Sequence, residues 1–152
     1  MRTFSSVKEL PDAVGEHLGY SDWLTVTQEQ VNQFADATGD HQWIHVDTDR
    51  AAAELPSKRT IAHGFLTLSL LSALIRQSIR VTGLRMAINY GLNRVRFVSP
   101  VPSGSRIRAL ITLHAIETVS GGFQVTWQVT IDCEDGDKPA CVAEWIVRYY
   151  PE

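Results

Sequence analysis

The fold of this chain is decided by residues 63–79, which read His-Gly-Phe-Leu-Thr-Leu-Ser-Leu-Leu-Ser-Ala-Leu-Ile-Arg-Gln-Ser-Ile. The pattern predicts a helix from Phe65 to about Ile79 whose apolar side chains lie on almost every side, relieved only by small hydroxyls. A helix without a wide polar face must be surrounded by other elements. We therefore expect this helix to be the centre of the molecule.

The strands that could enclose this helix follow it in the sequence. Apolar and polar residues alternate over 106–119 and 123–133, in the second half of 87–97, and from Ala143 to Tyr149. Gly91 interrupts the first of these runs and predicts a bulge or a close approach by another group. The resulting expectation is an α+β fold, with a curved antiparallel sheet wrapped around the long central helix.

Weaker patterns precede the central helix. The first three elements expected there are a short surface helix, a first strand, and a helix that Thr27 caps and Thr38-Gly39 ends. The apolar stripe of this last helix is short, and beyond its end residues 43–46 are expected to be extended. The expected ranges of the first two elements are 6–18 and 21–26, and a further short helix is expected from Asp49 to Glu54.

Length and composition favour one domain, residues 1–152, without a linker or repeat. The chain is 44% hydrophobic with a net charge of −3, and it has neither the basic stripe that nucleic acid requires nor an apolar run long enough for a membrane. No secretory signal is seen at the amino terminus, so a cytoplasmic protein is expected. Cys133 and Cys141 have no metal-ligand spacing and are expected to be reduced and buried.

The loop Thr38-Gly39-Asp40-His41-Gln42-Trp43-Ile44-His45 carries the residues that are best suited to chemistry. Asp40 and His45 provide a carboxylate and an imidazole on an irregular loop, which suits a general acid/base pair acting on one water. The alternatives are an ordinary helix stop with a solvated turn, and an Asp–His hydrogen bond that only stabilises the fold.

A second candidate lies at His63 and Gly64, where the central helix begins. The free N–H of Gly64 could donate a hydrogen bond to a developing oxyanion, and the missing side chain would let a ligand approach. The alternatives are a simple helix start for Gly64 and a capping or solvent-facing role for His63.

Other reaction classes have less support in the sequence. Asp40, His41, His45, Asp47 and His63 lack the spacing of known metal sites, so no metal and no bound cofactor are expected. The chain also lacks the Gly-x-Ser-x-Gly motif of serine hydrolases, which argues against a covalent intermediate.

The sequence closely resembles the MaoC-like dehydratases, the (R)-specific enoyl-CoA hydratases of the hot-dog fold. The resemblance is carried by residues 34–47, by Ala51-Ala52 and by residues 61–65, and it extends over nearly the whole chain. Its most specific part is Gly-Asp, four further residues and His, followed by His-Gly at the start of the central helix. Many members of the family have Asn and Pro where this chain has Gln42 and Trp43.

The resemblance implies a hydro-lyase of fatty acid metabolism that hydrates trans-2-enoyl-CoA reversibly to (R)-3-hydroxyacyl-CoA, with coenzyme A present only as part of the substrate. It implies that Asp40 and His45 are catalytic, with Asp40 as the base and His45 as the proton donor in hydration, and that the Gly64 N–H polarises the thioester carbonyl. It also implies a homodimer with sheets joined side by side. Further contacts to the substrate are expected from Gln42, His63, Tyr90, Gly91 and Asn93.

Two other functions are compatible with the same features. An acyl-CoA thioesterase on the same fold would need Asp40 to activate water against the carbonyl carbon, and His45 would be dispensable. A non-catalytic subunit that binds acyl thioesters, from coenzyme A or an acyl carrier protein, would keep the pocket without turnover.

Overall fold

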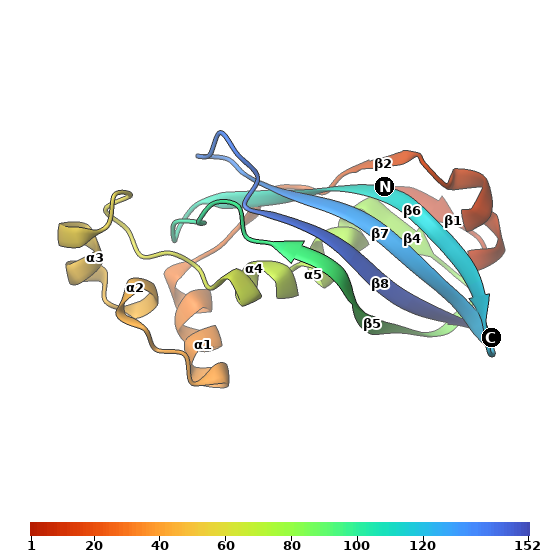
Figure 1. Cartoon of the computed structure of the whole chain (residues 1–152), viewed down its shortest axis with the longest axis horizontal. Coiled ribbons are helices and arrows are strands. Elements are labelled where there is room, and N and C mark those ends of the chain that lie inside the picture. The colour runs from red at the N-terminus through yellow and green to blue at the C-terminus, as the bar shows by residue number, and fades with distance from the viewer.

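The computed structural model describes all residues 1–152 and confirms an antiparallel sheet that curves around a central helical segment (Figure 1). Each long strand pairs with its neighbour in antiparallel register, and β3 (Leu24–Thr25) adds to the end of one of them. In spatial order the strands are β2 (His17–Tyr20), β6 (Arg106–Val119), β7 (Gly122–Cys133), β8 (Cys141–Pro151) and β5 (Leu84–Arg96).

The central helix is present, but Leu70 divides it into α4 (Gly64–Ser69) and α5 (Leu71–Ser78). Leu70 keeps a right-handed helical conformation, and its carbonyl accepts hydrogen bonds from the N–H groups of both Ala73 and Leu74. The interruption is therefore a local tightening within one helical path. The expected helix end at Ile79 is one residue too long, since Ile79 begins a strand.

The core forms between this helical path and the inner face of the sheet. Leu74 of α5 is fully buried, and alternate residues of β7 and of the first half of β6 are buried with it. Trp127, which is fully buried, is among the largest side chains in this core. Cys133 and Cys141 are free and buried, as expected, and pair in register with other residues rather than with each other.

The amino-terminal elements differ from the sequence-based expectation. A 3-10 helix, η1 (Val7–Ala13), replaces the expected longer helix, because Pro11 removes a backbone donor from its interior. The expected strand over 21–26 is reduced to β3, while β2 lies before it. A short parallel pair between β1 (Arg2–Phe4) and β4 (Ile79–Val81) was not expected at all.

Three helices lie beyond one end of the sheet (Figure 1): α1 (Gln28–Thr38), α2 (Trp43–Val46) and α3 (Thr48–Glu54). Thr27 caps α1, and Gly39 ends it in a left-handed conformation with a φ of 77°. The extended segment expected at 43–46 is wrong, since these residues form the single turn of α2. None of the helices is long and apolar enough to cross a bilayer.

Candidate active site

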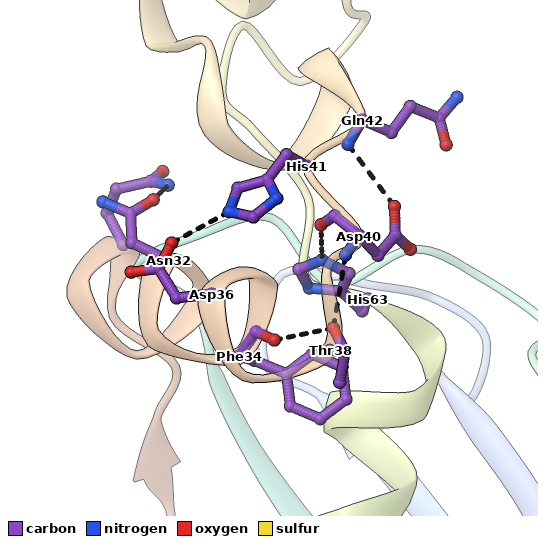
Figure 2. Close-up of polar contacts among 9 residues, drawn as sticks. Asn32, Phe34, Asp36, Thr38, Asp40, His41, Gln42 and His63 are labelled. Atoms are coloured by element: carbon purple, nitrogen blue, oxygen red, sulfur yellow. Dashed lines mark hydrogen bonds and ion pairs between the residues drawn. The ribbon is translucent and has the colours of Figure 1, made fainter.

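Asp40 is exposed and lies directly after the left-handed turn that ends α1. Its carboxylate accepts a long hydrogen bond of 3.4 Å from the N–H of Gln42, and its own N–H contacts the hydroxyl of Thr38 at 3.5 Å (Figure 2). Neither contact is strong, so the side chain itself is held only loosely. The carboxylate is therefore free to bind a ligand.

His45 is buried, and its position on α2 fixes which ring nitrogen can react. Nδ1 lies 2.6 Å from the carbonyl oxygen of Ile61, which can only accept a hydrogen bond, so Nδ1 carries the proton. In the neutral ring Nε2 then has a free lone pair. Asp40, His45 and His63 each bring one donor atom into a group whose members all lie within 4.8 Å of one another.

His63 joins these two residues from the start of α4. Its ring stacks on that of His45, with centroids 3.8 Å apart and planes inclined by 23°. Its Nε2 donates a hydrogen bond of 2.9 Å to the backbone carbonyl of Asp40 (Figure 2), while its buried Nδ1 has no partner. The structure thus brings together three of the residues that the sequence singled out.

Gln28 of α1 also supports α2, through the backbone of His45. The sequence pattern did not predict this contact. The Gln28 side chain donates a 2.8 Å hydrogen bond to the backbone carbonyl of His45, and its amide oxygen accepts one from Thr60. Thr60 also bonds to Ser103, which lies 43 residues away along the chain. Such long-range polar contacts have no local sequence signature, although a partly buried Gln facing a catalytic loop is a usable sign once the fold is known.

A cleft of about 280 Å³ opens beside His45, with Gly64, Thr67 and Phe97 among its lining residues. The Phe97 ring lies so close to Gly64 that a Cβ built there would be 2.8 Å from a ring carbon. Gly64 is the first residue of α4, so its N–H has no acceptor within the helix, and it bonds to no other backbone carbonyl. The cleft therefore combines an imidazole, a free N–H and an apolar wall.

Asp40, His45 and His63 are also the residues that could hold a metal ion. Imidazole ligands of one tetrahedral ion must point their in-plane lone pairs at a common point. The two rings here are stacked nearly parallel, so their lone pairs run side by side instead of converging. This arrangement suits proton transfer better than metal binding.

The unusual pair Gln42-Trp43 lies outside the cleft. Gln42 is exposed and precedes α2, with no side-chain capping hydrogen bond. Trp43 packs under the guanidinium of Arg50, 3.9 Å from the ring centroid. The expected reshaping of the pocket by the larger Trp43 therefore finds no support, because the ring is directed toward α3. His41 is exposed and turns toward Asp36 (Figure 2).

The remaining residues expected at the substrate lie elsewhere in the single chain. Tyr90 and Gly91 line a separate cavity of about 250 Å³ between α4, α5 and β5, and Asn93 lines neither that cavity nor the cleft beside His45. The bulge expected at Gly91 is confirmed, because the register with β8 shifts between Asn89 and Gly91. A role of these residues in a substrate tunnel stays a prediction.

The pKa of His45 lies below the usual 6.5, chiefly because burial disfavours the charged ring and also because His63 is close, against the raising effects of the Ile61 carbonyl and Asp40. Neutral His45 therefore stabilises the fold above pH 6.5, and this contribution is lost as the pH falls below that value. We expect the difference in Tm between the wild type and His45→Gln to shrink as the pH is lowered from about 7.5 to about 5. Differential scanning calorimetry checks this, and a difference that grows on acidification would contradict it.

Comparison with known proteins places these features in a family. The model of the MaoC-like domain matches residues 9–133. The chain is 59% identical over 150 residues to 3-hydroxyacyl-thioester dehydratase Z of Mycobacterium tuberculosis, covering 98% of this chain and 99% of that protein. It is 47% identical to nodulation protein N of Rhizobium leguminosarum bv. viciae, covering 93% and 89% of the two chains.

Among solved structures, the (R)-hydratase from A. caviae, which is involved in PHA biosynthesis, superposes with a TM-score of 0.68. The two sequences are 25% identical, and the match covers 91% of this chain and 96% of the other. This likeness agrees with the hot-dog fold that the curved sheet and its enclosed helix describe.

Proposed function

The chain belongs to the MaoC-like dehydratase family, and we propose on that premise that it is a hydro-lyase that hydrates trans-2-enoyl thioesters reversibly to (R)-3-hydroxyacyl thioesters. The observation that carries the proposal is that His45 lines one cleft together with Gly64, while the carboxylate of Asp40 lies within 4.8 Å of a donor atom of His45. The 3-hydroxyacyl-thioester dehydratase at 59% identity supports the same class of reaction. Coenzyme A is proposed as the carrier, as part of the substrate and not as a cofactor.

In this mechanism one water lies between Asp40 and His45, which both act as hydrogen-bond acceptors. The water oxygen attacks the β-carbon, and the electrons of the double bond move through the α-carbon onto the thioester oxygen. The water proton passes to the enzyme and is then delivered to the α-carbon, so that one water is added in total. Dehydration is the same sequence in reverse.

The state of His45 favours a reversal of the roles expected from the sequence. The lowered pKa keeps the His45 ring neutral near pH 7, and the single N–H of the neutral ring donates a hydrogen bond to the carbonyl of Ile61. Nε2 can therefore give a proton only after it has received one. We assign His45 as the group that takes the water proton and returns it to the α-carbon, while Asp40 orients the water and stabilises the transient imidazolium.

Gly64 is assigned to the thioester oxygen. Its N–H is without a partner at the first residue of α4, where the backbone donors of a helix are unsatisfied. A donor that is fixed before the reaction stabilises the enolate oxygen more than the neutral carbonyl, and so lowers the barrier. The apolar lining of the cleft, which includes Phe97, would limit the access of water to this oxygen once a substrate is bound.

A thioesterase is the second candidate, because Asp40 could direct the same water at the carbonyl carbon. The buried, oriented His45 favours the hydratase, since a single carboxylate would be enough for thioester hydrolysis. Incubation with crotonyl-CoA separates the two reactions: loss of the enoyl absorbance without free thiol supports the hydratase. Release of free thiol supports the thioesterase, and no turnover with any acyl chain length supports a non-catalytic binding subunit.

We propose that the reaction needs no metal, because the stacking of His45 and His63 prevents their lone pairs from converging. Prolonged dialysis against EDTA followed by gel filtration is therefore expected to leave the hydration rate unchanged. The control is the same protein assayed before dialysis. Loss of activity that returns on adding a divalent ion would contradict this prediction.

We also propose a homodimer that forms through β5. This strand pairs with β8 on one side only and is the last strand of the sheet, so its other edge has free backbone groups. Its exposed apolar side chains would be covered in a dimer; they are Met86, Ile88, Tyr90 and Leu92. Light scattering coupled to gel filtration is expected to give twice the chain mass of 17.0 kDa. A mass of one chain at micromolar concentration would contradict the proposal.

A further inference from the structure

His63 is a buried titratable residue to which the proposed mechanism gives no step. Only 3% of its surface is exposed, and it lies immediately before α4. The sequence suggested a contact with the substrate, but His63 is buried, its Nε2 is already bonded to the Asp40 carbonyl, and it does not line the cleft beside His45 and Gly64. Its function must therefore be sought in the groups that it does touch.

The face of the His63 ring supports His45. The two rings stack with centroids 3.8 Å apart, and the Phe34 ring of α1 lies 4.9 Å from His63, tilted by 54°. These aromatic groups shield His45 from water, and α2 alone, being a single helical turn, could not do so. The charged or titratable groups that act on His45 are His63 itself and Asp40.

The edge of the His63 ring holds Asp40. The Nε2–H group donates a hydrogen bond of 2.9 Å to the Asp40 carbonyl, whereas the other hydrogen bonds of Asp40 are 3.4 and 3.5 Å long. Gly39, the preceding residue, is in a left-handed conformation and leaves this loop exposed. The bond from His63 is thus the best-formed contact between the backbone of Asp40 and the body of the protein (Figure 2).

We propose that His63 is a positioning residue that sets the Asp40 carboxylate and the His45 ring at a fixed separation, through one hydrogen bond and one aromatic stack, without touching the substrate. The inference rests on the proposed hydratase function for its kinetic consequences. Its geometric part does not depend on the substrate. The Nδ1 atom of His63 has no hydrogen-bond partner, which is consistent with this role because the ring is bonded through Nε2 and packed against His45 and Phe34.

Two substitutions separate the two contacts. His63→Phe keeps a flat ring beside His45 but removes the donor to Asp40, and His63→Gln keeps an N–H near the position of Nε2 but removes the stacked ring. His41→Gln is the matched control, because His41 is the exposed histidine of the same loop and bonds only to Asp36 among side chains. Thermal melts of all three proteins show whether they are folded.

With crotonyl-CoA as substrate, His63→Phe is expected to lower kcat by about 10- to 100-fold with KM changed by less than about threefold, since Asp40 loses its anchor while binding is kept. His63→Gln is expected to move the acid limb of the pH profile of kcat/KM upward toward 6.5, because water reaches His45. His41→Gln is expected to behave like the wild type in both measurements.

A rise in KM with unchanged kcat in His63→Phe would overturn the inference and make His63 a substrate contact. Wild-type values of kcat and of the acid limb in both folded variants would overturn it as well. Histidine NMR titration of His45 in the wild type and His63→Gln tests the stacking contact without any substrate. An unchanged pKa of His45 there overturns that contact, even if crotonyl-CoA proves not to be the substrate and only the proposed function fails.

Discussion

Replacing His45 with Ala is expected to lower kcat/KM for enoyl-thioester hydration by about 10³-fold, because the only imidazole at the cleft that can carry the proton is removed. Asp40→Asn is expected to cost about 10²-fold or more, since the amide keeps the size of the side chain but loses the negative charge that orients water and stabilises imidazolium. Steady-state loss of enoyl absorbance measures both effects.

The control for these two variants is His41→Gln, which alters a histidine four residues from His45 that faces Asp36 and not the cleft. It is expected to retain full activity. Circular dichroism should show unchanged secondary structure in all three proteins. A His45→Ala protein that is folded and retains more than about a tenth of wild-type hydration activity would show that His45 is dispensable for hydration, which would contradict its assigned role.

Gly64→Ala is expected to lower kcat/KM by about 10²-fold, the effect of losing a hydrogen-bond donor to an oxyanion. The new Cβ would lie 2.8 Å from a carbon of the Phe97 ring, a distance so short that Cβ atoms in proteins essentially never show it. Either the ring or the start of α4 must move, and each shift misplaces the N–H relative to the thioester oxygen. The same hydration assay measures the loss.

Two further variants test the physical reason for this loss. Gly136→Ala is the matched control, because a Cβ at Gly136 would make only ordinary contacts, the nearest at 3.4 Å, and that residue has no positive φ and does not line the cleft. The double variant Gly64→Ala/Phe97→Ala removes the ring that causes the clash and should recover part of the lost rate. Equal activity of Gly64→Ala and Gly136→Ala would argue against the assigned role of Gly64.

The sheet and the central helix could be predicted because their signals are periodic and long. Alternation over β6 and β7 fixes which side chains face inward, and the apolar surface of residues 65–79 requires enclosure. Short elements lack such averaging: α2 is a single turn, whose conformation depends on hydrogen bonds from Gln28 and Ile61. The local pattern at 43–46 therefore predicts an extended segment where the structure has a single helical turn.

The candidate site could be predicted in its residues but not in its contacts. Asp40, His45 and Gly64 were identified from the motif, and their proximity follows from loops that meet at one end of the helix. The donation from His63 to the Asp40 backbone and the approach of Phe97 to Gly64 join segments more than 20 residues apart, and they depend on how α1 and β5 pack. No local pattern encodes such pairings.

The most direct test of the proposed chemistry is the position of the oxygen that water adds. Crotonyl-CoA is incubated with the protein in ¹⁸O-labelled water, and the products are analysed by mass spectrometry and chiral chromatography. The account predicts (R)-3-hydroxybutyryl-CoA with the label at the β-hydroxyl, an intact thioester, and none of this product with Asp40→Asn/His45→Ala. Label in a free carboxylic acid, accompanied by released coenzyme A, would contradict it and would mean that water attacks the carbonyl carbon.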